Sequence, residues 1–303
     1  MIYTVTFNPS IDYVMFTNQF EVGGLNRAHE TNKFPGGKGI NVSRVLNTLK
    51  VENTATGFVG GFPGEFIKDK LEQSNILTDF IEVEEDTRIN VKLKTGSETE
   101  INGPGPNIEP QHYESFLNKM KQTISSDTVI IAGSVPSTLK KPVYKEVAEI
   151  LKETGATLIV DAEKDLMKSI LSFEPKFVKP NKTELEEIFD KEINTDQEVI
   201  DCAKQLIEEG AQSVIVSLGG EGAIYVDSNI QLKAIVPNGE VVNTVGSGDS
   251  TVAGMVAGLT TGKDIEEAFK LAVSCGTATA FNADLAEHED IERILSKVTI
   301  KHL

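Results

Sequence analysis

Residues 128–133 are TVIIAG, a short and continuous apolar run that predicts a strand buried on both faces of a sheet. Two similar runs follow, TLIVD at residues 157–161 and SVIVS at residues 213–217. The segment between these two has apolar residues at the spacing of one helix face, namely Val199, Ile200, Ala203, Leu206 and Ile207. Buried strands that alternate with amphipathic helices indicate an α/β fold, with a mostly parallel central sheet flanked by helices on both faces.

The N-terminal third has a different pattern. Residues 1–7 predict a strand that joins the sheet, and the apolar spacing within residues 38–50 predicts a helix. Residues 88–94, RINVKLK, alternate strictly between polar and apolar, residues 95–98 form a turn, and residues 99–102 return. This pattern predicts a hairpin with one apolar and one polar face, and such a hairpin cannot bury its apolar face by itself.

We therefore expect two parts. Residues 1–11, 34–86 and 105–303 form the α/β domain, and residues 12–33 and 87–104 form a small β-sheet lid. The apolar face of the lid is expected to pack on a second copy of the chain or on the main domain.

The composition excludes several kinds of partner. The 303 residues carry 29 Lys and Arg against 46 Asp and Glu, and the resulting net charge of −17 repels nucleic acid and anionic membranes. No apolar run approaches the ~20 residues of a membrane span, and the first residues lack the features of a signal peptide. Two cysteines without a CxxC pair favour a reducing cytoplasm, and four scattered histidines argue against a zinc site.

The segment with the most specific signal is NTVGSGDSTVAG, residues 243–254. Val241 and Val242 before it suggest a strand, and the small apolar residues after it suggest a helix. Glycines at the start of a helix let its N–H groups approach an anion, and a carboxylate there suits proton acceptance. The alternative is that Asp249 or Ser247 is a helix cap.

A second glycine-rich segment, FPGGKGINV at residues 34–42, also precedes a helix. Its backbone N–H groups, the charge of Lys38 and the amide of Asn41 suit a sugar or a phosphate. The alternative is a glycine-rich turn with a solvated lysine. Asp12 follows the first strand at the edge where α/β sheets bind ligands, so it either holds sugar hydroxyls or caps a turn.

Two more segments suggest a nucleotide site. SLGGEGA at residues 217–223 follows a buried strand and precedes another, so it is either a turn that contacts a nucleotide or a plain hairpin turn. KPNKTEL at residues 179–185 forms a capping box in which Asn181 caps a helix and Glu184 reaches back, and the functional alternative is that both hold magnesium-bound water. Arg27, Lys38, Arg88 and Lys92 are candidates for a substrate phosphate.

In this order, the segments resemble the PfkB (ribokinase-like) family of carbohydrate kinases along nearly the whole chain. NPSID at residues 8–12 is similar to the family's sugar-contacting start, GGKGINV at residues 36–42 to its first signature, and GSGD at residues 246–249 to its second. KPNKTE at residues 179–184 is similar to its magnesium-linked NxxE motif, and residues 217–222 are similar to its nucleotide turn.

The resemblance implies an ATP-dependent sugar-phosphate kinase with Mg²⁺ as its cofactor. It implies that Asp249 is the catalytic base and that Gly246, Ser247 and Gly248 form the anion hole. The implied substrate-binding residues are Asp12, Gly36, Gly37, Lys38, Asn41, Arg88, Asn102, Arg27 and Ser134. The implied ATP-binding residues are Ser217, Leu218, Gly219, Gly220, Glu221, Gly222, Gly248, Asn181 and Lys179. Glu184 is implied to hold the metal through water.

Within the family, residues 1–6, 22–27, 87–94 and 99–106 resemble bacterial members that phosphorylate fructose 1-phosphate on its C6 hydroxyl. The tagatose-6-phosphate kinases are near relatives, and GSGDSTVAG at residues 246–254 is at least as similar to theirs. The resemblance also implies a homodimer through the lid. A catalytically silent sugar-phosphate sensor on the same fold, and a nucleoside or unphosphorylated-sugar kinase, remain as alternatives.

Overall fold

The computed structural model describes residues 1–96, 98–162 and 164–303. A parallel sheet forms its centre, in the order β10-β9-β1-β4-β5, with β6 also paired to β4. Its strands are β1 Ile2–Thr6, β4 Thr54–Gly60, β5 Leu77–Thr78, β6 Ile81–Val83, β9 Thr128–Ala132 and β10 Thr157–Asp161. Parallel bridges of Val178 to Val160 and to Val214 connect this sheet to the next one. The prediction of a mostly parallel central sheet is confirmed.

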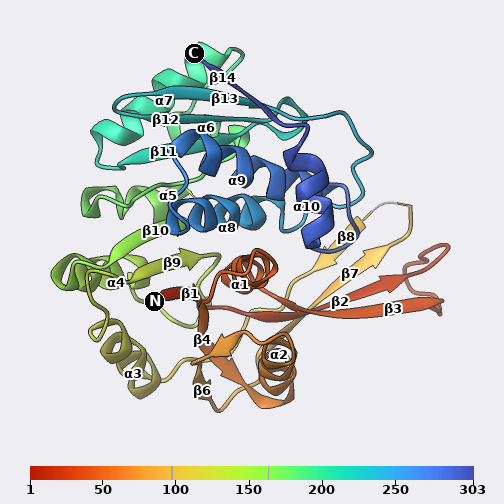
Figure 1. Ribbon diagram of the computed structural model, residues 1–303. Coiled ribbons are helices and arrows are strands. Elements are labelled where there is room, and N and C mark those ends of the chain that lie inside the picture. Colours follow the sequence, from red (N-terminus) through yellow and green to blue (C-terminus); the bar gives the residue numbers. More distant parts are fainter. Residues whose placement is uncertain (97, 163) are drawn as a thin grey trace.

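An antiparallel sheet continues from these bridges in the order β11-β12-β13-β14 (Figure 1). Its strands are β11 Ser213–Ser217, β12 Ala223–Asp227, β13 Gln231–Ile235 and β14 Thr299–His302. A short 3₁₀ turn, Gly219–Glu221, connects β11 to β12. The expectation of a strand rather than a helix after residues 217–222 is therefore confirmed.

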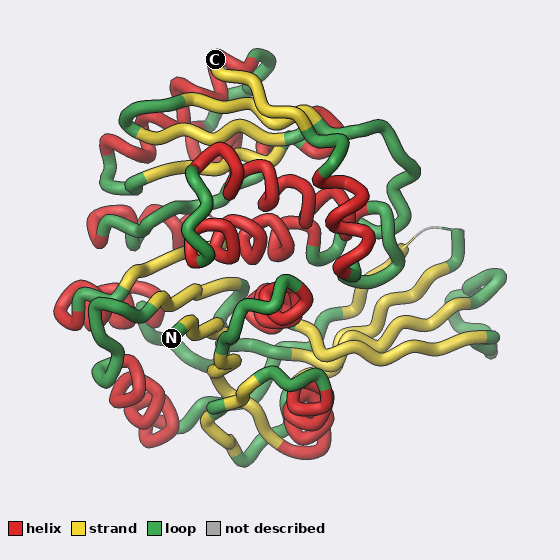
Figure 2. Tube along the Cα trace, viewed as in Figure 1, coloured by secondary structure: helices red, strands yellow, loops and turns green. Residues whose placement is uncertain are grey.

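Helices cover both faces of the sheets, as Figure 2 shows. They are α1 Lys38–Thr48, α2 Gly61–Gln73, α3 Pro110–Met120, α4 Val143–Thr154, α5 Lys164–Lys168, α6 Lys182–Phe189, α7 Asp196–Glu208, α8 Ser247–Thr260, α9 Ile265–Ala280 and α10 His288–Leu295, with a 3₁₀ turn at Leu171–Phe173. Because side chains alternate along a strand, Val129 and Ile131 of β9 join the core with α3, α4, α6 and α7. Ile130 joins the other core, with α1, α8, α9 and α10. None of the described helices is long and apolar enough to cross a membrane.

A third sheet projects from this body in the order β3-β2-β7-β8 (Figure 1). Its strands are β2 Ser10–Phe16, β3 Glu30–Gly36, β7 Arg88–Lys94 and β8 Glu98–Ile101. The β7–β8 hairpin was predicted from its alternation and is confirmed. We call these four strands the lid.

The burial of the two lid faces differs from the expected pattern. Ile89 and Ile101, on the apolar face, are 38% and 63% exposed, whereas Asn90 and Lys92 on the polar face are buried. The reason is that the polar face lies on the cavity side of the lid, where Asn90 donates to Ser10 and Asp12 and Lys92 pairs with Asp12, all within the lid. In the single chain, the apolar face is therefore left partly open.

The strand expected at Val241 and Val242 was wrong. Both side chains are exposed, and the chain from residue 236 to residue 246 is a loop. Instead of joining a strand, the N–H groups of Val242 and Asn243 donate to Ala280 O at the end of α9. The glycine segment is therefore carried by a loop that is fixed to α9.

Candidate active site

A cavity of about 840 Å³ lies at the carboxyl ends of the parallel strands, between the lid and the start of α8. Thr6 of β1, Ala132 of β9 and Asp161 of β10 line it from the sheet. This is the edge where open α/β sheets bind ligands, because the strands end there and the following loops diverge.

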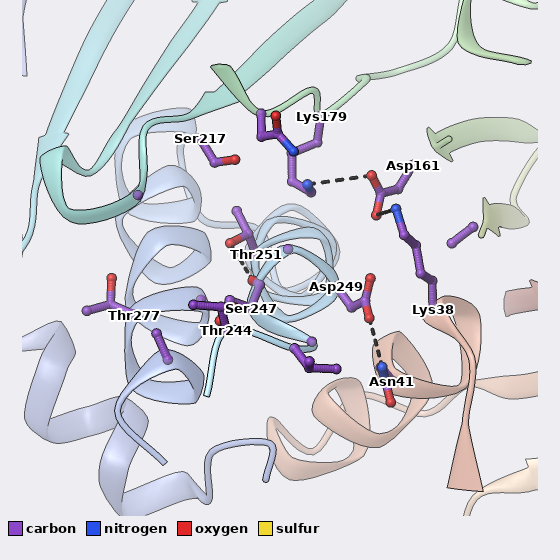
Figure 3. A pocket seen from close by; sticks show the side chains of 18 of the residues that line it. Lys38, Asn41, Asp161, Lys179, Ser217, Thr244, Ser247, Asp249, Thr251 and Thr277 are labelled. Atoms are coloured by element: carbon purple, nitrogen blue, oxygen red, sulfur yellow. Dashed lines mark hydrogen bonds and ion pairs between the residues drawn. The ribbon is translucent and has the colours of Figure 1, made fainter. Parts of the chain in front are cut away.

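Asp249 lies at the inner wall of this cavity, in the first turn of α8. Its side chain is 5% exposed, and its Oδ2 accepts a hydrogen bond of 2.8 Å from the Asn41 amide of α1 (Figure 3). Burial, together with the negative charge of Asp161, raises the pKa of Asp249 to about 6, although Lys38, Asn41 and Lys179 act in the opposite direction. A carboxylate with this pKa is ionised at neutral pH and is a stronger base than an ordinary aspartate.

The turn that begins α8 requires glycine at position 246, and Gly248 in its first turn leaves room for a neighbouring lysine. Gly246 precedes α8 with φ 80°, a left-handed conformation that side chains other than glycine rarely adopt. A Cβ atom on Gly248 would lie 2.9 Å from the Lys179 Nζ. The N–H groups of Gly248 and Asp249 have no acceptor within the helix, because they belong to its first turn. The N–H of Ser247 donates to Thr244 O at 3.2 Å, so it has to change partner before it can bind a ligand.

Two lysines border the same wall. The Lys38 Nζ, from the start of α1, lies 3.4 Å from Asp161 Oδ2, and the Lys179 Nζ lies 3.5 Å from Asp161 Oδ1 (Figure 3). Burial alone would raise the pKa of Asp161, but the two lysines lower it, and Asp161 in turn raises the pKa of Lys38. Asp161 and Lys38 are therefore both charged, and the Lys179 side chain lies against the glycine loop at Gly248.

On the lid side, Asp12 is held by three donors. Its Oδ1 accepts from Ser10 Oγ at 2.8 Å and from Asn90 Nδ2 at 3.2 Å, and its Oδ2 lies 3.2 Å from Lys92 Nζ. Arg88 lines the cavity while its guanidinium donates to Asn8 O and Gly103 O. Gly37, Asn102 and Ser134 also line the cavity. The lid thus presents both signs of charge to the cavity.

At the opposite end, the β11–β12 turn and the start of α6 face the cavity. Ser217, Gly219, Gly220, Gly222, Lys179, Asn181 and Glu184 line it. A further group comes from the 236–246 loop and from α9: Val236, Pro237, Asn238, Gly239, Val273, Thr277, Ala280 and Phe281. A Cβ atom on Gly239 would lie 2.4 Å from the Phe281 ring, so the loop rests directly on that ring. The side chains at this end form a mostly apolar slot that suits the flat ring of a nucleotide base.

Comparison with known proteins identifies the family. The family model for pfkB carbohydrate kinases matches residues 5–290. The chain belongs to this family. It is 46% identical over 303 residues, all of both chains, to a 1-phosphofructokinase of Bacillus subtilis. It is 35% identical over 285 residues, 92% of each chain, to a tagatose-6-phosphate kinase of Staphylococcus epidermidis. The crystal structure of phosphofructokinase-2 from Escherichia coli in complex with fructose-6-phosphate matches with a TM-score of 0.91, 28% identity and 98% of each chain.

Most of the site residues that sequence reasoning predicted line the cavity of this pfkB-family kinase, but not all of them lie there. Arg27 is exposed in the β2–β3 loop of the lid, and it does not line the cavity of the same chain. Gly36, Leu218 and Glu221 are also outside the lining. Gly36 lies beside the lining instead, because a Cβ atom there would collide with the Asp12 carboxylate at 2.6 Å.

The sequence analysis did not single out Asp161, although a signal was present. Asp161 directly ends a buried apolar strand at the carboxyl edge of a parallel sheet, the same position that drew attention to Asp12 near β1. The slot proposed for the nucleotide base was missed because Val236 comes from a loop, whereas Thr277 and Phe281 come from the C-terminal end of α9, and nothing in their sequence context connects them.

The residues present suit a magnesium ion that keeps most of its water ligands, rather than one bound by protein side chains alone. Among the described residues, no group of three or more His, Cys, Asp or Glu side chains gathers at a metal-binding distance. The Glu184 Oε2 accepts from Asn181 N at 2.8 Å in a complete capping box, which confirms the predicted box. Since Glu184 also lines the cavity, its carboxylate would hold water bound to a magnesium ion, which would neutralise phosphate charge.

Proposed function

We propose that this kinase transfers the γ-phosphoryl group of ATP to the C6 hydroxyl of D-fructose 1-phosphate, giving fructose 1,6-bisphosphate and ADP. The observation that carries the proposal is Asp249, a buried carboxylate with a raised pKa at the start of a glycine-capped helix, in the same cavity as Asp12 and Arg88. The full-length similarity to a relative named 1-phosphofructokinase supports the choice of sugar phosphate.

In this proposal, the lid and the start of α1 hold the sugar. The Asp12 carboxylate and the Asn41 amide accept and donate hydrogen bonds to hydroxyl groups, and backbone N–H groups near Gly37 add to them. Arg88 binds the 1-phosphate, since it lies on the lid side of the cavity wall with a partly exposed side chain, whereas Lys38, which pairs with Asp161, faces the phosphoryl group that is transferred. Arg27 would take part only from a neighbouring chain, because it lies far out on the lid.

The transfer step follows from the position of Asp249. The C6 oxygen attacks the γ-phosphorus in line, its proton passes to the Asp249 carboxylate, and the bond from the γ-phosphorus to the β–γ bridging oxygen breaks, so that ADP leaves. The N–H groups of the first turn of α8 and the two nearby ammonium groups stabilise the charge on the transferring group. Because water would otherwise compete as the acceptor, closure of the lid over the sugar is expected to precede the transfer.

ATP is proposed to lie from the β11–β12 turn to the slot formed by the 236–246 loop and α9. Lys179, Asn181 and Glu184 then lie along the phosphates. Magnesium supplies charge neutralisation to the phosphates when it is bound. Two buried free cysteines, Cys202 and Cys275, support a reducing compartment, so we propose a cytoplasmic enzyme.

The test is a substrate panel on the purified chain with ATP and Mg²⁺, in which ADP release is measured. Fructose 1-phosphate is expected to give the highest kcat/KM, ahead of fructose 6-phosphate and tagatose 6-phosphate. A preference for tagatose 6-phosphate would transfer the proposal to the second candidate, which the 35% identity to a tagatose-6-phosphate kinase supports. Absence of ADP release with every sugar phosphate would leave a sugar-phosphate sensor, and activity on an unphosphorylated sugar or a nucleoside would contradict the role of Arg88.

A homodimer through the lid belongs to the same proposal. Ile89 and Ile101 form an exposed apolar strip on the face of the lid that points away from the cavity. An apolar sheet face that is open in a single chain is commonly covered by a partner. We propose that a second copy of the chain covers it.

A further inference from the structure

The contact between Asp161 and two lysines is the feature that the proposed reaction does not yet use. Asp161 is 2% exposed, and each of its carboxylate oxygens lies about one ion-pair distance from a different ammonium group, 3.4 Å from Lys38 and 3.5 Å from Lys179. The two lysines come from segments that are 141 residues apart in the chain, and Asp161 lies on a third element, the end of β10.

Direct contact of Asp161 with a substrate is not needed to explain this arrangement. Both oxygens face lysines, and its negative charge would repel phosphate oxygens. Burying an unpaired carboxylate costs free energy because the charge loses its water, and Asp161 offsets this by pairing with two lysines. The same charge also lies near Asp249, whose ionisation it opposes.

The ion pairs with Asp161 fix the positions of both lysine ammonium groups. The Lys179 ammonium packs against Gly248, since a Cβ atom there would lie 2.9 Å from it, and Lys38 begins the helix that also carries Asn41. Without a carboxylate between them, two ammonium groups on one cavity wall would repel each other. With it, three charges sum to a single positive charge that faces the glycine loop.

We propose that Asp161 is a positioning residue that clamps Lys38 and Lys179 on either side of the path along which the phosphoryl group moves. This proposal rests on the proposed function. Asp161 acts through the lysines: it keeps both ammonium groups at fixed positions, where they stabilise the charge of the transferring group without reorganisation.

Asp161→Asn is the direct test, because it keeps the shape and removes the charge. We expect kcat with fructose 1-phosphate to fall on the order of tenfold or more, with a smaller change in KM for ATP, since the loss concerns the transition state. The groups that face Asp249 are Asp161, Lys38, Lys179 and Asn41. Removing the one negative charge among them should move the acidic limb of the kcat/KM profile to lower pH, by about half a pH unit or more.

Lys179→Met should shift the acidic limb of the kcat/KM profile in the opposite direction. It removes a positive charge that favours ionised Asp249, so the acidic limb should move to higher pH. The matched control is Asp196→Asn, which breaks a carboxylate–lysine pair with Lys233 outside the cavity and should leave both kcat and the limb unchanged. If Asp161→Asn does not fold, the Lys179→Met profile is still decisive.

Two results would overturn the proposal. In one, Asp161→Asn lowers only the melting temperature and keeps kcat and the acidic limb of the wild type, which indicates a purely structural pair. In the other, the acidic limb of the kcat/KM profile of Lys179→Met lies at the same pH as in the wild type. Failure of the proposed function is distinguishable from both, because it appears in the wild-type chain as a lack of turnover with any sugar phosphate.

Discussion

A carboxylate that takes a proton from an alcohol has to be ionised before the reaction, close to the alcohol and shielded from water. Asp249, the proposed base, is ionised at neutral pH and shielded from water because of its surroundings rather than its identity. The Asn41 amide orients one oxygen at 2.8 Å, and burial together with Asp161 raises the pKa. The two lysines keep that rise moderate, so the group remains charged at neutral pH.

The first prediction concerns the base itself. Asp249→Ala should lower kcat by ~10² or more, because general-base catalysis typically contributes 10²–10⁴-fold. The Kd of ATP, measured by calorimetry, should stay within about threefold of the wild type, because the nucleotide slot lies at the other end of the cavity. Near-normal turnover in this variant would count against the role of Asp249.

The second prediction concerns pH. Because Asp249 acts only when ionised and its pKa is about 6, kcat/KM should fall as the pH drops through about 6, by about tenfold for each further pH unit. Initial rates between pH 5 and pH 8, with the folded state checked by circular dichroism, measure this. A flat profile down to about pH 5 would contradict the raised pKa.

The third prediction concerns Arg88. Arg88→Ala should raise KM for the sugar phosphate at least about tenfold, because a bidentate contact to a phosphate is lost, while KM for ATP changes little. The comparison with Arg44→Ala serves as a control, since Arg44 pairs with Asp284 outside the main cavity. Equal effects of Arg88→Ala on both KM values would remove Arg88 from the sugar side.

At the scale of elements, the position of the glycine loop depends on how closely α8 packs on α9. Gly254 and Gly258 face α9, where a Cβ atom would lie 2.7 Å from the Ala272 Cα and 2.6 Å from the Ala268 Cα. Small residues let the two backbones approach, and the N-terminal turn of α8 is then fixed relative to the 236–246 loop, which is bonded to the end of α9. The position of Asp249 is thus set by helix packing about 10 Å along the helix, given its ~1.5 Å rise per residue.

The fourth prediction follows from this packing. Gly254→Val should lower the free energy of unfolding by about 1–3 kcal/mol, because overpacking a buried contact with backbone forces the helices apart. Denaturant unfolding of the variant measures the loss. Gly220→Val is the control, since a Cβ atom there meets nothing within 4 Å, and its effect should stay within about 0.5 kcal/mol.

At the scale of the whole molecule, the two faces of the lid differ in chemistry and in exposure. The polar face carries Asp12, Asn90 and Lys92 toward the main domain, and the other face leaves Ile89 and Ile101 exposed. A lid with an open apolar face is fixed more firmly when a second lid covers it, so dimer formation and the sugar site are expected to be coupled.

The fifth prediction tests that coupling. Ile101→Lys should convert the protein from dimer to monomer in light scattering at micromolar concentration, because a charge is placed in the proposed interface. It should also raise KM for the sugar phosphate. Leu77→Lys is the matched control, an equally drastic change at an exposed leucine of the main domain, and it should alter neither. A wild-type chain that is already monomeric would contradict the proposed dimer.

The sequence by itself determined the fold class, the lid hairpin and the capping box, because each depends on local periodicity or on residues three apart. It also pointed to Asp249, since a glycine loop before a helix has a local signature. The strand expected at Val241 and Val242 failed because β-propensity is decided by the available partner strand, and α9 took up those N–H groups instead.

Only the tertiary structure decided which residues surround Asp249. Asn41, Asp161 and Lys179 lie 208, 88 and 70 residues away in the sequence, and no pattern within a segment relates them. Their contact arises because parallel strands bring their carboxyl ends to one edge, where α1 and α8 begin. The raised pKa and the exposed lid face arise in the same way, since burial and charge proximity are properties of the packed chain.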